Sequence, residues 1–541
     1  MKIVNYNNRN CLKIDDEPFQ LLIVAESGHG KGMSSEAIME RWKRITGGIV
    51  ICVNDPKQEN EQFFVQYEPE ELYHLKDLKR DGIRKAKYPV KLYHPFSFEL
   101  SKKGFLPPMT IFTLSIKDLV RGDWSILAET DAETETIKLL ERVSEYLPRN
   151  YSLFDFLLEI ERLTEGKKIG EGKRDKNNWG LKPGGGTAKS IRQIGNMLSS
   201  FQKNYFLRKD TCPYKLNWDE ILLDPEPYHV FSTTYITNPK VRNFLAVCLI
   251  GQAVRNAQRL ANLGKLKKPI LFYIPELKKV CPDESTGSSV FLAKSLSGTI
   301  VTGRSQAQGI SFLSDTQIWS KTHPEARASF SDTFYGRLNP EDARIIFKAK
   351  SYDAPTRKMF NDIEENYCTY IWDGKETYGV FKVHSPSHMH KEVKYNWVQM
   401  YKKHFPEKMV RYDELVKEMR KEYVEEESAI DKIIQKEIQE KENKEDKKDK
   451  KESKPVTPKK DTAKDYLYKR AWELNKDGLS DRKIAEELGI KSHKTAKKYY
   501  LKYEEELKPQ IKEKEDILPN LGQGILPEEV ESNFGDAVDT E

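Results

Sequence analysis

The sequence predicts an α/β protein, in which a mainly parallel sheet flanked by helices is followed by a small all-α domain. Continuous apolar runs alternate with helical patterns through the first 400 residues, and this alternation is typical of parallel strands that helices cover on both faces. Charged and polar residues then dominate positions 424–463, which therefore cannot bury a hydrophobic core. Beyond that segment, residues 464–506 regain the apolar periodicity of short packed helices.

The predicted strands are short runs that are apolar almost throughout. They are Gln20–Ala25, Ile49–Val53, a run from His229, Ile270–Ile274 and a run from Gly309. A long amphipathic helix follows the third strand and ends near Gly264, and a later hairpin turns at Asp373–Gly374. The predicted domains are residues 1–400 with an insert at about 100–225, a charged helix and linker at 401–463, a helical domain at 464–506 and an acidic flexible tail at 507–541.

Composition argues against several classes of protein. Of the 541 residues, 38% are apolar and 32% charged, and no stretch approaches the roughly 18 apolar residues that span a bilayer. The amino terminus lacks the pattern of a secretion signal. The six cysteines are scattered without a CxxC pair, which argues against a zinc site or a disulfide framework. We therefore expect no membrane span, no zinc site and a cytoplasmic location, in the host cytoplasm if the protein is viral, and the sequence assigns no residue as a metal ligand.

A candidate phosphate-binding loop is the sharpest local pattern, in the segment LLIVAESGHGKGMSSEAIMERW that begins at Leu21. A buried strand leads into a glycine-rich turn, a lysine and a helix. Glycines let successive backbone N–H groups point inward, the helix amino terminus adds partial positive charge, and the lysine reaches the outer phosphates. The segment predicts a nucleotide site for ATP, formed by Ser27, Gly28, Gly30, Lys31, Gly32, Met33 and Ser34.

The loop departs from the pattern GxxxxGK[ST] at two positions. Ala25 stands where the first glycine is expected, and Gly32 stands where a hydroxyl normally contacts Mg²⁺. Ser34 or Ser35, one turn into the helix, could supply part of that function. The alternative interpretation is a glycine-rich turn that binds no ligand. The similar run at Pro183–Ser190 has neither a preceding apolar strand nor a GK pair, so we interpret it as a loop.

Further segments follow the phosphate loop in the order found in the HerA/FtsK superfamily of P-loop ATPases. VNDPKQE at Val53–Glu59 resembles the DPKGE segment of that group, ILFYIPEL resembles its Walker B strand, and GTIVTGRSQAQGISFLSDTQ resembles the stretch that ends in a glutamine. The resemblance covers about residues 15–392. It implies a RecA-like P-loop NTPase core, ATP with Mg²⁺ as the ligand, double-stranded DNA as the partner and a homo-hexameric ring.

The resemblance also implies roles for individual residues. Lys31 would hold the β- and γ-phosphates, Glu276 would polarise the attacking water, and Gln317 would sense the γ-phosphate or orient that water. An arginine from a neighbouring subunit would offset the charge that develops in the transition state. The candidates for this arginine are Arg304 and, after it, Arg327 and Arg337.

Both usual magnesium contacts are missing from the sequence. Pro275 precedes Glu276, where a Walker B strand normally carries aspartate, and Gly32 replaces the loop hydroxyl. Asp55, Glu26 or bound water could take part instead, so the magnesium ligands stay open. The alternative is a site that binds nucleotide without hydrolysing it.

A helix-turn-helix is the predicted fold of residues 464–506. LSDRKIAEELGIKSHKTAKKYY resembles this motif, in which Gly489 permits the turn and the second helix enters the DNA major groove. The predicted core positions are Ala471, Leu474, Ile484, Ala485, Leu488 and Ile490. The predicted DNA-binding residues are Ser492, His493, Lys494, Thr495, Lys497 and Lys498. The alternative is a small helical module that binds protein. The lysine-rich segment 164–192 would either contact DNA phosphates or form a solvated insertion.

Together these patterns predict an ATP-driven translocase of double-stranded DNA, in viral genome packaging, plasmid transfer or DNA-end processing. Such a protein would act as a hexameric ring, with a nuclease or a capsid or portal protein as a further partner. The rival hypothesis is a DNA-binding regulator, dimeric on palindromic sites, that uses nucleotide as a switch or not at all. Gly32 and Pro275 favour the rival, whereas Lys31, Glu276 and Gln317 favour the motor.

Overall fold

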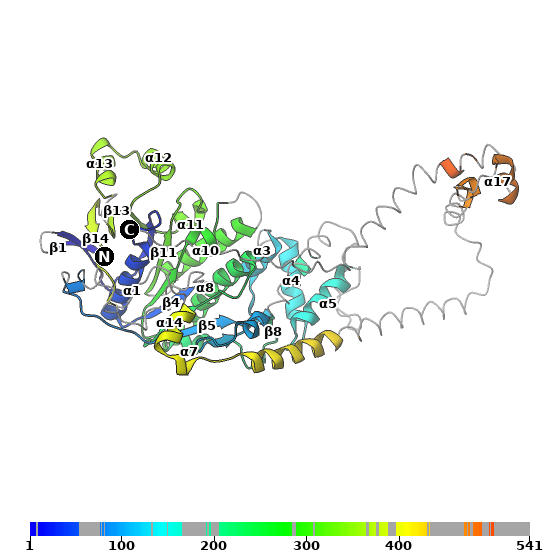
Figure 1. Cartoon of the computed structure of the whole chain (residues 1–541), viewed down its shortest axis with the longest axis horizontal. Coiled ribbons are helices and arrows are strands. Elements are labelled where there is room, and N and C mark those ends of the chain that lie inside the picture. Colours follow the sequence, from blue (N-terminus) through cyan, green and yellow to red (C-terminus); the bar gives the residue numbers. More distant parts are fainter. Residues whose placement is uncertain are drawn as a thin grey trace, which may run out of the picture. The chain divides into compact units, whose positions relative to one another are not determined.

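The chain divides into two compact units, Met1–Gln435 and Lys436–Glu541, in the computed structural model (Figure 1). The structure describes residues 1–6, 9–53, 76, 78–79, 82–130, 134–148, 150–164, 191, 194–195, 198, 205–283, 288–306, 309–363, 367–374, 378–387, 397–429, 432, 470–472, 474–476, 480–488, 497 and 499–501. Among these residues, no helix is both long enough and apolar enough to cross a membrane.

A twelve-stranded sheet forms the centre of the first unit, as far as the described residues show it. Its strand order is β1-β2-β14-β13-β12-β3-β11-β10-β4-β9-β5-β6. The strands are β1 (Lys2–Tyr6), β2 (Arg9–Lys13), β3 (Gln20–Val24), β4 (Ile49–Val53), β5 (Val90–Pro95), β6 (Thr110–Phe112), β9 (Tyr228–Phe231), β10 (Ile270–Ile274), β11 (Ile310–Thr316), β12 (Asp332–Tyr335), β13 (Thr369–Asp373) and β14 (Tyr378–Lys382). Every pairing from β12 to β6 is parallel, and a separate short pair joins β7 (Leu114–Ser115) to β8 (Leu207–Arg208).

Helices cover both faces of this sheet. The α-helices of the first unit are α1 (Lys31–Thr46), α3 (Arg121–Ala128), α4 (Glu135–Tyr146), α5 (Leu153–Thr164), α7 (Trp218–Leu222), α8 (Pro239–Asn262), α9 (Leu277–Val280), α10 (Ser288–Gln306), α11 (Pro324–Ala328), α12 (Pro340–Ala349), α13 (Ala354–Asp362) and α14 (Trp397–His404), as far as the described residues show them. The separate second unit contains α17 (Asp481–Glu487). Short 3₁₀ helices lie at Phe98–Lys103, Ile116–Asp118 and Pro406–Lys408. α1 lies on one side of the sheet, and α8 and α10 lie on the other (Figure 1).

Alternate residues of each central strand enter the two apolar layers. In β11, Phe312 packs in the layer that contains α8 and α10, whereas Leu313 packs in the layer that contains α1. This two-sided burial explains why the strand sequences are apolar throughout rather than alternating. The predicted fold class, a mainly parallel sheet flanked by helices as in a RecA-like core, is therefore confirmed. The strands predicted at Ile49–Val53 and Ile270–Ile274 have the same bounds in the structure.

The insert packs against a helix from the segment predicted as a charged helix and linker. Residues 413–429 are helical, and Val416 and Met419 pack with Phe96 and Phe154 in one buried cluster. Arg208 has only 1% of its side chain exposed, and it forms ion pairs with two glutamates of this helix, Glu422 and Glu426. Removing either side of such a buried pair leaves an uncompensated charge, so we infer that this helix is needed for the stability of the insert.

The second unit has a small apolar core. Ala471, Leu474, Ile484 and Ala485 are buried there, as the sequence predicts, together with Tyr500. The Tyr500 hydroxyl donates a hydrogen bond to the Asp481 carboxylate at the start of α17, at 3.1 Å. Of the six predicted DNA-binding positions, Lys497 is described and exposed, and the other five lie outside the described residues. The helix-turn-helix stays a prediction.

Candidate nucleotide site

The predicted phosphate loop lies between β3 and α1, in the middle of the sheet. Gly28 and Gly30 have left-handed backbone φ values of 81° and 89°, and these allow the chain to reverse between strand and helix. α1 begins at Lys31, and its N-cap residue, Gly30, has no side chain that could cap the first turn. The loop therefore presents the first backbone N–H groups of a 16-residue helix, the geometry that binds phosphate in other proteins.

Lys31 stands over this loop. Its side chain is nearly buried, and its ammonium donates a hydrogen bond to the Glu26 carbonyl oxygen at 3.0 Å. Arg337 lies against the same turn, because its Nε is 3.0 Å from the Glu26 carboxylate and its Nη2 donates to the Ser27 carbonyl at 3.2 Å. Two cations of one chain therefore converge on the turn at Glu26 and Ser27, which suits a polyphosphate ligand.

His29 fastens the loop to β13. Its Nε2 donates a hydrogen bond to the Thr369 carbonyl at 2.8 Å, and its own carbonyl accepts one from the Cys368 N–H at 3.0 Å. Burial lowers the pKa of His29, and the nearby charges of Arg337 and Lys31 lower it further. The imidazole is therefore neutral at physiological pH, with its proton on Nε2, and serves to hold the loop in place.

Replacement of Gly30 by alanine should destabilise the protein more than replacement of Gly28. Either alanine would adopt a left-handed backbone, a strain of about 1–3 kcal/mol. A Cβ at Gly30 would also lie 2.5 Å from the Cys368 Sγ and 2.9 Å from the Tyr367 ring, whereas a Cβ at Gly28 would meet nothing within 4 Å. Overpacking of this kind adds about 1–3 kcal/mol. In thermal unfolding, Gly30→Ala should give the lower midpoint temperature, and equal midpoints would contradict the packing against β13.

Glu276 and Gln317 meet at the carboxyl edge of the sheet. Glu276 lies two residues beyond the end of the Walker B-like strand β10, after Pro275, has a left-handed φ of 54° and is 3% exposed. Gln317 directly follows β11, which lies between β3 and β10. The Gln317 Nε2 donates a hydrogen bond to the Glu276 Oε1 at 2.6 Å. Two residues that were predicted as catalytic from separate segments of the sequence are therefore in contact, beside the strand that leads into the phosphate loop.

The three candidate arginines have different surroundings. Arg327 donates a hydrogen bond to the Trp319 carbonyl at 2.7 Å, and its guanidinium lies 4.4 Å from the centre of the Trp319 ring. These contacts give the Arg327 side chain a structural role in local packing. Arg337 lies at the phosphate loop of its own chain, as described above. Arg304 belongs to α10, but its side chain lies outside the described residues, as does the whole of Asp55.

The remaining predicted loop residues pack on β13. The Ser34 hydroxyl accepts a hydrogen bond from the Tyr370 hydroxyl at 2.9 Å, and the Met33 sulfur lies 3.9 Å from the Cys368 Sγ. Both contacts fix the start of α1 against the neighbouring sheet. Because the Ser34 hydroxyl is engaged with Tyr370, it is a poorer replacement for the missing loop hydroxyl than the sequence alone indicates.

Asp315 is a site residue that the sequence analysis missed. It is buried in β11, where its carboxylate accepts hydrogen bonds from the Tyr273 hydroxyl and, at 3.4 Å, from the Glu276 backbone N–H. An aspartate inside an otherwise apolar strand, two residues before Gln317, is the signal that could have identified it, since buried carboxylates are rare without a partner. Among the described residues, no group of three or more His, Cys, Asp or Glu side chains could hold a metal ion.

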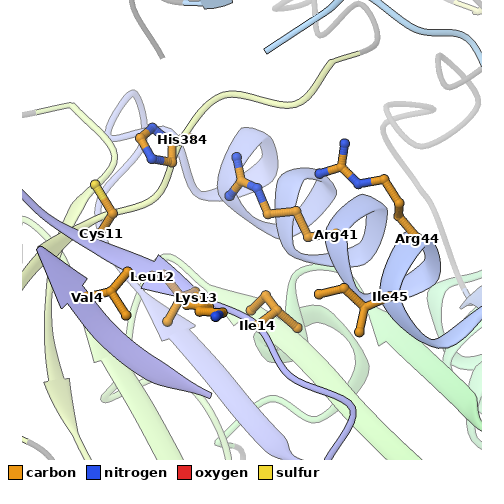
Figure 2. Close-up of a pocket in the computed structure, with 9 residues that line it drawn as sticks. All are labelled: Val4, Cys11, Leu12, Lys13, Ile14, Arg41, Arg44, Ile45 and His384. Atoms are coloured by element: carbon orange, nitrogen blue, oxygen red, sulfur yellow. The ribbon is translucent and has the colours of Figure 1, made fainter. Parts of the chain in front are cut away.

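A separate basic pocket lies along the second half of α1. It has a volume of about 260 Å³, and Figure 2 shows its lining of apolar side chains with Lys13, Arg41, Arg44 and His384. Arg41 and Arg44 follow Lys31 by 10 and 13 residues, so they lie about 15–20 Å along the helix from the phosphate loop. This pocket is therefore not part of the candidate nucleotide site.

Comparison with known proteins gives distant structural similarities. No family model and no curated protein matches the chain. Among solved structures, VirB4 of Thermoanaerobacter pseudethanolicus is similar with a TM-score of 0.42 and 10% identity, over 68% of this chain and 89% of that one. The plasmid coupling protein TrwB in complex with the non-hydrolysable ATP analogue ADPNP gives 0.43 and 14%, over 71% and 89%.

A third similarity is to a viral protein. The genome packaging NTPase B204 from Sulfolobus turreted icosahedral virus 2, in complex with ATP-gammaS, gives a TM-score of 0.23 and 10% identity, over 31% of this chain and 72% of that one. All three TM-scores are below 0.5, so the similarity to these structures is distant.

Proposed function

We propose that the protein is an ATP-hydrolysing motor that moves double-stranded DNA. The observation that carries this proposal is the contact between Glu276 and Gln317, at the carboxyl edge of the same strands that position the phosphate loop. A carboxylate and an amide beside a phosphate loop are the groups needed to activate water and to respond to the γ-phosphate. A loop that served only as a structural turn would not need this pair.

The chain's own residues account for binding and for water activation. Lys31 would leave the Glu26 carbonyl for the β- and γ-phosphates, and the N–H groups at the start of α1 would bind phosphate oxygens. Arg337 would add a second cation from the same chain. Glu276 would accept a proton from the attacking water, with its carboxylate held in place by Gln317. When bound, Mg²⁺ would offset the negative charge of the phosphates.

Assembly and DNA contacts complete the proposal. In a homo-hexameric ring, Arg304 of one subunit would reach the nucleotide of its neighbour, and the lysine-rich segment 164–192 would contact the phosphates of DNA in the ring. The second unit would dock on DNA through the residues from Ser492 to Lys498. Packaging of a viral genome, plasmid transfer and DNA-end processing are the settings that fit, with a nuclease or a capsid or portal protein as partner, in a cytoplasmic compartment.

A DNA-binding regulator without ATP turnover is the second candidate. Gly32 and Pro275 favour it, because neither offers a side-chain oxygen at the positions where Mg²⁺ is usually held. In such a protein, Lys31 and Arg337 would still bind nucleotide, and the Glu276 and Gln317 pair would be a remnant.

The two candidates differ in assembly and in turnover. We expect mass photometry of the full chain to show hexamers that form or strengthen with ATP, and we expect long double-stranded DNA to raise ATP hydrolysis several-fold. Only monomers or dimers with ATP and DNA both present, together with no hydrolysis in magnesium or manganese, would contradict the motor and favour the regulator. A truncation that ends at residue 463 serves as a control, since it should lose DNA docking while it keeps its basal hydrolysis.

A further inference from the structure

The magnesium side of the proposed nucleotide site lacks the two side chains that usually serve there. Gly32 and Pro275 occupy those positions, and neither carries a side-chain oxygen. Mg²⁺ in nucleotide sites keeps several waters and needs only one or two protein oxygens besides the phosphates. One place that could supply such an oxygen lies below the first turn of α1, at the carboxyl ends of β10 and β11.

Asp315 occupies such a position on β11. It pairs with Ile23 of the phosphate-loop strand β3, and the preceding Ser314 pairs with Ile274 of β10. Asp315 therefore stands between the two strands that end at the phosphate loop and at Glu276. Because side chains alternate along a strand, its carboxylate lies on the same face as Leu313, and Leu313 packs in the layer that contains α1.

The Asp315 carboxylate is held in a fixed place although it is buried. The Tyr273 hydroxyl, from the next strand and the same face, donates to one oxygen, and the Glu276 N–H donates to the other at 3.4 Å. Burial of a carboxylate is unfavourable, so its retention here indicates a use. A single-oxygen contact to a hydrated cation is compatible with both hydrogen bonds, since each carboxylate oxygen has two lone pairs.

Ser35 lies on the side of α1 that faces β4. Residues four positions apart lie on the same side of a helix. Met39, four residues after Ser35, has its sulfur 3.8 Å from the Cys52 Sγ of β4. Trp42, one turn later, packs against Gly48, which precedes β4. Met33 and Ser34, in contrast, contact β13 on the other side. Ser35 therefore lies on the side of α1 that faces β4 and not β13, one helical turn after Gly32.

The Ser35 hydroxyl forms no hydrogen bond with any residue that the structure describes. It is also fully buried. A buried hydroxyl without a partner is destabilising. Alanine would fill the same space without that penalty, so a ligand is the simplest reason for a hydroxyl at this position.

From these two observations we propose that Asp315 and Ser35 bind the hydrated divalent cation that accompanies the nucleotide, in place of the strand aspartate and the loop hydroxyl. The inference rests on the proposed nucleotide site. The carboxylate contact to the cation would come from β11, the neighbour of the Walker B-like strand β10, and the hydroxyl contact from a residue one helical turn after Gly32. At these positions the two side chains would contact the cation partly through bound water. Glu276, engaged with Gln317, is then left to act on the attacking water.

The experiment measures how strongly Mg²⁺ promotes nucleotide binding. The full chain is titrated with the fluorescent analogue mant-ATP in EDTA and again in millimolar Mg²⁺. The wild type should bind about tenfold or more tightly with Mg²⁺. Asp315→Asn should reduce this ratio to about twofold or less, while its affinity in EDTA stays equal or rises because a negative charge is removed. Asp342→Asn is the matched control, since Asp342 is equally buried, accepts hydrogen bonds from Trp319 and Ser320, and should keep the wild-type ratio.

Ser35→Ala keeps the test decisive if Asp315→Asn does not fold. This variant should lower the Mg²⁺ ratio several-fold and should unfold at the same temperature as the wild type or higher, a combination that a purely structural serine would not give. A full wild-type ratio in both variants would overturn the inference, and so would a wild type that binds mant-ATP equally well with and without Mg²⁺. A wild type that binds no mant-ATP under either condition would overturn the proposed nucleotide site as well.

Discussion

Lys31→Ala should weaken ATP binding by about 100-fold. Lys31 is the only lysine in the phosphate loop, and its ammonium is poised over the turn at Glu26, where it would exchange one backbone carbonyl for two phosphate groups. A hydrogen bond that involves a charged group contributes about 1.5–3 kcal/mol, and 1.4 kcal/mol corresponds to a tenfold change in affinity. Calorimetric titration or fluorescence with mant-ATP would measure the loss.

Arg44→Ala is the matched control for this variant. Arg44 belongs to the same helix, is exposed and lies 13 residues after Lys31, so its removal takes away one positive charge without touching the loop. It should leave ATP affinity within about twofold of the wild type. An unchanged affinity in Lys31→Ala would contradict the phosphate loop itself, and an equal loss in both variants would mean that Lys31 acts only through net charge.

Glu276→Gln should lower the rate of ATP hydrolysis by about 10²–10⁴-fold, the range that general-base catalysis contributes, and should leave ATP binding intact. The substitution is well suited to this site, because a glutamine oxygen can still accept the hydrogen bond that Gln317 now donates to Glu276 at 2.6 Å. The geometry of the pair would therefore be retained, while the proton acceptor would be lost. Steady-state hydrolysis with and without long double-stranded DNA would measure the effect.

Glu325→Gln provides the comparison, since Glu325 is an exposed carboxylate at the start of α11. It should hydrolyse ATP at the wild-type rate. Turnover of Glu276→Gln within about threefold of the wild type would remove Glu276 from the mechanism and leave the Glu276 and Gln317 contact as a structural one. DNA-stimulated turnover that is lost only in Glu276→Gln would place the catalytic carboxylate despite Gly32 and Pro275.

Local sequence patterns were sufficient to predict the parts of the fold that depend on residues close together in the sequence. The strand at Ile270–Ile274 is apolar on both faces, because helices cover both sides of it, and this doubled burial is visible in the sequence. The phosphate loop was visible for a similar reason, since a strand, two glycines, a lysine and a helix follow one another within one short segment. The strands β1, β2, β5 and β6, at or next to the two edges of the sheet, were not predicted, because their sequences are less apolar and their pairing depends on distant segments.

The sequence by itself determined the doubly covered parallel sheet, and it predicted a phosphate loop at Lys31 and two polar site residues, Glu276 and Gln317, at strand ends. Only the tertiary structure decided which side chains share a site. It brought Asp315 beneath α1 and set Arg337 against the loop. It also distinguished Ser34, which bonds Tyr370, from Ser35, whose hydroxyl has no partner within the described part of the chain. These relations join residues up to about 340 positions apart. They follow from strand order and from the side of the helix that faces the sheet, which no local pattern specifies.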